Sequence, residues 1–143
     1  METLILAGIV VVAAYVLMNQ DKNAEEKKKG GKPLVSPRTL PECFSTFQDI
    51  LTEYHKDNKW WNFREVNEKE GRMIAIMNFG ELIGDDIGTA ERYIVLTATF
   101  EPVEEGKTAI YMLFEGKSTW NRQTVDEIIS DIRMRVRYRL GAS

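Results

Sequence analysis

The chain has 143 residues, a formal net charge of −3 and one cysteine, Cys43. One cysteine excludes an internal disulfide and any metal site built from several thiolates. Residues 34–143 carry 14 Lys and Arg against 18 Asp and Glu, and this acidic balance argues against general nucleic-acid binding.

The first feature along the chain is an uncharged apolar segment, residues 4–18. At about 1.5 Å per residue, a helix over residues 1–20 covers about 30 Å, the thickness of the hydrocarbon core of a bilayer. We therefore expect residues 1–20 to form a single transmembrane anchor. A cleaved signal peptide and a buried or interfacial helix are the alternatives, although the start lacks the basic residues of a signal peptide.

The charges that flank this segment predict its orientation. No Lys or Arg precedes it, and several lysines follow, so the N-terminus is expected outside and the remaining domain in the cytoplasm. Residues 21–37 are rich in lysine and contain two glycines and two prolines, which is typical of a flexible linker. The candidate contacts with lipid headgroups are Lys22, Lys27, Lys28, Lys29 and Lys32, and a solvated linker is the alternative.

Residues 38–143 are predicted to form one folded α+β domain. Apolar residues at spacings of three and four, from Phe44 to Tyr54, predict a helix over residues 41–57. The period then changes to two, which predicts strands over residues 61–68, 72–79, 92–101 and 107–115. We expect an antiparallel four-stranded meander flanked by an N-terminal and a C-terminal helix (α-β-β-β-β-α), with both helices on one face.

The stretch IRMRVRYRL near the C-terminus alternates like a strand but is predicted to be helical. Its apolar residues continue a helical stripe that consists of Val125, Ile128, Ile129, Ile132, Val136 and Leu140. Thr124 and Glu127 provide a capping box at the start. The four arginines should consequently spread around the helix, and Met134 and Tyr138 should form a small apolar patch between Arg133 and Arg137.

No pattern of residues predicts catalysis, a cofactor or a metal. Cys43 and His55 lie on one predicted helix about 18 Å apart, too far for a nucleophile and its base. The loop over residues 80–91 holds the four carboxylates Glu81, Asp85, Asp86 and Glu91, but it does not match a calcium-binding loop. We interpret it as a hairpin connection or a contact loop.

The adjacent tryptophans Trp60 and Trp61 should point to opposite faces of an extended segment, so that one enters the core and the other needs a partner. The candidate contacts with protein partners are therefore Trp60, Trp61, Arg133, Met134, Arg137 and Tyr138.

These observations together predict a non-enzymatic, single-pass membrane protein. We expect it to be an accessory or assembly subunit of a larger membrane complex, with lipids and integral-membrane proteins as partners. A membrane-tethered binding module for a lipid or another apolar ligand is the alternative, and it requires an open apolar cavity between helices and sheet. A hydrolytic or metal-dependent enzyme is a third interpretation, and it requires the four loop carboxylates to converge.

Overall fold

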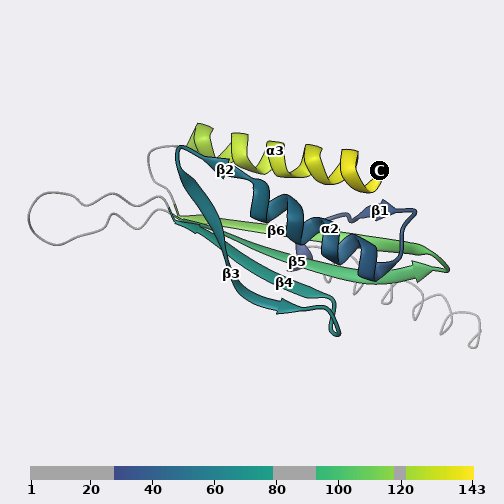
Figure 1. Cartoon of the computed structure of the whole chain (residues 1–143). Helices are drawn as coiled ribbons and strands as arrows, with labels where there is room; N and C mark the ends of the chain where they lie inside the picture. Colours follow the sequence, from purple (N-terminus) through teal and green to yellow (C-terminus); the bar gives the residue numbers. More distant parts are fainter. Residues whose placement is uncertain (1–27, 79–92, 118–121) are drawn as a thin grey trace, which may run out of the picture.

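The computed structural model describes residues 28–78, 93–117 and 122–143 of the chain (Figure 1). These residues form two helices and six strands, which contact one another around one core. In chain order the elements are β1 (Leu34–Ser36), α2 (Leu40–Glu53), β2 (His55–Lys56), β3 (Lys59–Asn67), β4 (Arg72–Asn78), β5 (Tyr93–Glu104), β6 (Lys107–Lys117) and α3 (Arg122–Leu140).

The six strands form one antiparallel sheet in the order β1-β6-β5-β4-β3-β2, and the sheet curves into a half-barrel. The predicted four-stranded meander is therefore wrong. β1 adds an edge to β6 by pairing Leu34 with Ile110, and it lies in the segment that was predicted to be a linker. β2 adds the opposite edge by pairing His55 with Trp60. Strands of three and two residues are too short to show a period of two in the sequence.

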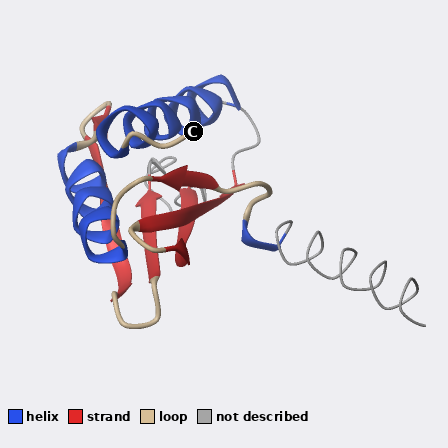
Figure 2. Cartoon of the chain, turned by 90° about the vertical axis from the view of Figure 1, so that its right-hand side faces the viewer, coloured by secondary structure: helices blue, strands red, loops and turns tan. Residues whose placement is uncertain are grey.

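Both helices pack on one face of the sheet, as Figure 2 shows. Phe47 of α2 meets Phe100 of β5 edge to face, with the ring centroids 5.3 Å apart. Ile132 and Val136 of α3 are completely buried in the same core. The predicted mixture of helices and sheet is thus retained, but with a larger sheet than the sequence indicated.

Helix α2 ends at Glu53, earlier than the predicted boundary at residue 57. Tyr54 leaves the helix in an extended conformation, and the chain then turns into the hairpin between β2 and β3. The two turn residues, Asp57 and Asn58, have positive φ values of 52° and 63°. Two consecutive residues in this conformation form the tight turn that joins neighbouring antiparallel strands, which a helix cannot contain.

The predicted membrane span is also corrected. Among the described residues, no helix is both long and apolar enough to cross a membrane. α2 has 14 residues, or about 21 Å, and α3 has 19 residues but carries acidic and basic side chains along its length. The segment for which the anchor was predicted, residues 1–20, lies outside the described residues. The single-pass assignment and the cytoplasmic location that followed from it are therefore given up.

Candidate contact surface on the C-terminal helix

The structure places the six predicted contact residues differently. Trp61 is only 5% exposed and packs in the core. Trp60 is 51% exposed, and the centroid of its ring lies 4.6 Å from the ring centroid of His55 on the neighbouring strand. The other four residues, Arg133, Met134, Arg137 and Tyr138, all lie on the exposed side of α3.

Successive residues of α3 turn by about 100° around its axis, so its side chains spread around the whole helix. Four sides can be distinguished. One side is the buried stripe that includes Ile132 and Val136. Met134 and Tyr138 occupy the opposite, outward side, where they are 61% and 88% exposed. The arginines lie between these sides, as predicted: Arg135 and Arg139 on the flank toward α2, Arg133 and Arg137 on the flank toward β6.

The flank toward α2 is occupied by contacts within the domain. The guanidinium of Arg135 lies 4.9 Å from the centroid of the Tyr54 ring. Arg139 donates from Nη1 to Oε2 of Glu53 over 2.9 Å. The Tyr54 hydroxyl donates to Oδ2 of Asp131 over 2.9 Å, and burial, followed by this bond, raises the pKa of Tyr54. These contacts hold the two helices together and leave little of this flank for a partner.

The flank toward β6 is different. The guanidinium of Arg133 lies 5.5 Å from the centroid of the Phe114 ring, but neither Arg133 nor Arg137 forms an ion pair with another described residue. Both arginines line two adjacent depressions. One, of about 530 Å³, is lined by Asp126, Ile129, Ser130, Arg133, Met134 and Arg137. The other, of about 210 Å³, is lined by Gly30, Lys32, Leu34, Ile110, Met112, Arg133 and Arg137.

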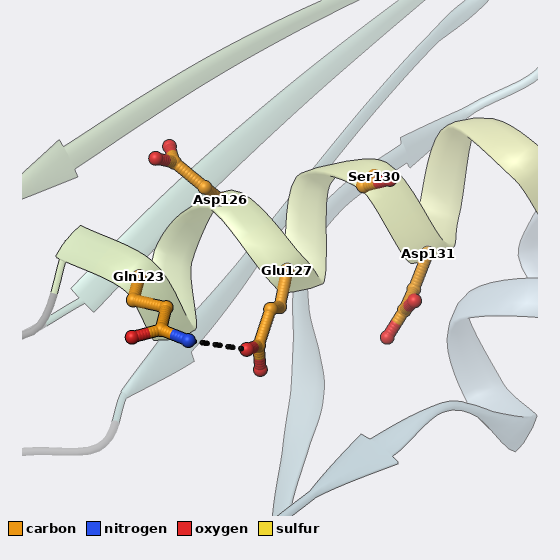
Figure 3. A pocket seen from close by; sticks show the side chains of 5 residues that line it. All are labelled: Gln123, Asp126, Glu127, Ser130 and Asp131. Atoms are coloured by element: carbon orange, nitrogen blue, oxygen red, sulfur yellow. Dashed lines mark hydrogen bonds between the residues drawn. The ribbon is translucent and has the colours of Figure 1, made fainter.

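The first half of α3 carries an acidic depression of about 580 Å³ (Figure 3). Its lining residues are Gln123, Asp126, Glu127, Ser130 and Asp131. Gln123 donates to Oε1 of Glu127 over 3.3 Å, and Lys56 donates to Oε2 of the same carboxylate over 3.0 Å. All the lining residues belong to α3, so this depression is an open part of the helix surface.

Residues that were considered for chemistry do not form a site in the described part of the chain. Cys43 is completely buried in α2, whereas His55 lies in β2 with its ring tilted against that of Trp60. The loop carboxylates Glu81, Asp85, Asp86 and Glu91 lie outside the described residues. Within the residues that are described, no group of three or more His, Cys, Asp or Glu side chains could hold a metal ion.

The space between the helices and the sheet is filled by side chains. Phe47 of α2, Leu96 of β5 and Ile132 of α3 are each 0% exposed, and they belong to one continuous cluster. A core packed in this way offers no support for the alternative of an apolar ligand between helices and sheet.

The lysines of the predicted linker take different positions. Lys29 forms an ion pair with Glu101 and lies 5.0 Å from the centroid of the Tyr111 ring. Lys28 and Lys32 are exposed, and Lys32 lines the small depression beside Arg133 and Arg137. Sequence reasoning missed this neighbourhood, because Lys32 and Arg133 are about 100 positions apart and only the pairing of β1 with β6 brings them together. Lys22 and Lys27 lie outside the described residues.

No family model matches the chain, and the comparisons with curated proteins and with solved structures find no match either. The class of the protein is therefore defined by its own fold and surface: an α+β domain with a packed core and an exposed, partly apolar and charged helix face.

Proposed function

We propose that the chain is a non-enzymatic accessory or assembly subunit of a larger protein complex, and that it joins its partner through the outward side of α3. The observation that carries this proposal is the exposure of Met134 and Tyr138, 61% and 88%, one helical turn apart. Arg, Met and Tyr are the residue types that protein interfaces enrich, and here they gather on one rigid helix.

The contacts beneath this face support the proposal. Ile132, Val136 and Leu140 fix α3 to the core from below, and Arg139 is bound to Glu53 of α2. The outward side chains therefore start from a backbone that is already ordered. Binding through such a face costs less conformational entropy than binding through a loop.

The proposal is tested with the full chain carrying Met134→Gln and Tyr138→Ser. The complex is extracted from cells at native abundance in mild detergent, which keeps the apolar residues 4–18 from aggregating, and it is then sized. We expect the unmodified chain to migrate within a larger species, and the double variant to leave it. Both side chains are exposed, so the free energy of unfolding of the double variant should stay within about 0.5 kcal/mol of that of the unmodified chain.

Val103→Ser is the matched control. Val103 is another exposed apolar residue, at 51%, but it lies near the C-terminal end of β5 and not on α3. This variant should remain in the complex. Migration of the unmodified chain as a lone monomer, or equal retention of the double variant, would contradict the proposal.

A further inference from the structure

We infer that the partner on this face is a second copy of the same chain, with the two α3 helices antiparallel across a two-fold axis at Ser130. The inference rests on the proposed function, because it names the occupant of the contact surface proposed above. It is carried by the order of charges along the outward side of α3, by the position of a small residue at its centre and by the depressions that lie beside it.

The outward side of α3 and the flank toward β6 together form a surface that is self-complementary in charge. From the first to the last turn, its exposed residues are Gln123, Asp126, Glu127, Ser130, Arg133, Met134, Arg137 and Tyr138. Acidic side chains precede Ser130 and basic side chains follow it. An antiparallel second copy reverses this order and places each acidic half against a basic half. A two-fold axis makes the contact twice with the same residues, which is the commonest symmetry of protein dimers.

The helical geometry makes the pairing specific. Asp126 and Met134 are both four positions from Ser130, so Asp126 of one copy lies level with Met134 of the other. At about 100° per residue, Asp126, Arg133 and Arg137 all lie to the same side of Ser130, within about 60° of it. A two-fold axis perpendicular to the helices keeps that side in register. Asp126 of each copy is thereby placed between Arg133 and Arg137 of the other.

The residues on the other side of Ser130 complete the contact. Gln123 and Glu127 of one copy lie there opposite Met134 and Tyr138 of the other, at similar distances from the axis. The Met134 side chain and the Tyr138 ring can cover the aliphatic parts of Gln123 and Glu127, and the exposed Tyr138 side chain can bring its hydroxyl to a carboxylate. The most exposed apolar side chains of the helix would then be buried.

The exposed surface of α3 is continuous across the proposed axis. The open depressions of about 580 Å³ and about 530 Å³ share two lining residues, Asp126 and Ser130. Ser130, at the middle of this surface, has a short side chain and is exposed. Small residues at a crossing point allow two helices to approach closely.

The helix dipole alone does not explain this pattern. It favours acidic residues in the first turn and basic residues in the last, whichever side they face. In α3, however, the arginines of one flank have partners within the domain, Tyr54 and Glu53, whereas Arg133 and Arg137 have no carboxylate partner among the described residues. A second copy supplies that carboxylate as Asp126. Since the contact is one helix wide, we expect a smaller interface than the usual 1,600 Å² or so, and hence a weak, salt-sensitive dimer.

A charge exchange tests the inference on the full chain in non-ionic detergent, by sedimentation equilibrium. One variant is Asp126→Lys and the other is Arg133→Glu with Arg137→Glu. Each variant alone places like charges together and should weaken self-association at least about tenfold. An equimolar mixture should restore it, because in the mixed dimer both charge clusters are again complementary. Raising the salt from about 50 to about 500 mM should weaken the unmodified dimer several-fold.

Ser130→Cys gives an independent measurement, because a residue on a two-fold axis meets its own copy. Mild oxidation should link the Ser130→Cys chains into dimers. Ser45→Cys, on the exposed side of α2, is the matched control and should not be linked, and the natural Cys43 is completely buried. All variants keep whatever association other parts of the chain contribute. Only the difference in association between a variant and the unmodified chain is therefore assigned to α3.

The outcomes separate this inference from the proposed function. A monomeric unmodified chain at all concentrations, or a mixture that fails to restore association, overturns the pairing of two copies. If the Met134→Gln, Tyr138→Ser variant nevertheless leaves its larger complex, the contact surface stands and its partner is a different protein. If that variant stays in the complex as well, both proposals fall.

Discussion

The hydroxyl of Tyr54 donates a 2.9 Å hydrogen bond to Oδ2 of Asp131, which lies 77 positions further along the chain. It joins the end of α2 to the middle of α3, beside the Arg135 guanidinium that covers the same tyrosine ring. This contact links the two helices at their surface, in addition to the buried stripe that fixes α3 to the core.

Replacement of Tyr54 by Phe should destabilise the domain by about 1 kcal/mol, since it removes one hydrogen bond and leaves the ring in place. Urea denaturation measures this loss. Thr52→Val is a suitable control, because the exposed Thr52 hydroxyl donates to the carbonyl oxygen of Gln48 within the same helix. A Tyr54→Phe variant as stable as the unmodified chain would show that the bond contributes nothing.

The same contact makes stability depend on pH at the alkaline end. Burial and the bond to Asp131 raise the pKa of Tyr54 above its ordinary value near 10. The unfolded chain therefore loses this proton at a lower pH than the folded chain does. The stabilisation is complete below about pH 10 and is lost as the pH rises through the pKa of the folded state. Between pH 8 and pH 11, the melting temperature should fall more steeply with pH for the unmodified chain than for the Tyr54→Phe variant.

The turn between β3 and β4 requires a glycine at position 71. Gly71 has a φ of +66°, and a Cβ added there would lie 2.3 Å from the carbonyl oxygen of Phe100. Gly71→Ala should cost about 1–3 kcal/mol, because the left-handed conformation and the contact with the backbone both oppose the new methyl group. The free energy of unfolding from denaturant titration gives the value.

Gly106→Ala is the matched control for this prediction. Gly106 also has a positive φ, +76°, but a Cβ there would meet nothing within 4 Å. The difference between the two variants isolates the contact with Phe100 from the conformational cost. Equal losses at both positions would mean that the contact is relieved without cost.

The two adjacent tryptophans should respond in opposite ways to truncation. Trp61→Ala removes a large side chain from the core and should cost about 3–5 kcal/mol. Trp60→Ala removes a half-exposed ring that contacts His55, and it should cost less than about 1 kcal/mol. Chemical denaturation of the two variants decides this prediction. A larger loss in the free energy of unfolding for Trp60→Ala than for Trp61→Ala would contradict the burial of Trp61.

Several elements could be predicted from the sequence because their signals are local. The period of two placed β4 and β6 within two residues of their observed ends, and the helical stripe from Val125 to Leu140 predicted α3 despite the alternating arginines. These patterns reflect which side of each element faces the core, so they are present in any window of ten residues or so. The spread of the arginines around α3 followed from the same geometry.

Other features depended on neighbours that are distant in the sequence. β1 exists because Leu34 pairs with Ile110, and β2 exists because a hairpin turn ends α2 at Glu53, before the predicted boundary. Neither carries an apolar pattern of its own. The prediction of a membrane anchor relied on the hydrophobicity and length of one segment, and the described residues contain no helix that could cross a membrane.

The sequence by itself determined that this chain builds strands with a period of two and a C-terminal helix with Met134 and Tyr138 opposite its apolar stripe. Only the tertiary structure decided which tryptophan is buried and which arginines have partners. The periodicity of a strand or a helix defines its sides, but it does not determine which side chains another element places against each side. Those side chains, Glu53 and Tyr54 against one flank of α3 and Phe114 against the other, leave Arg133 and Arg137 without a carboxylate among the described residues.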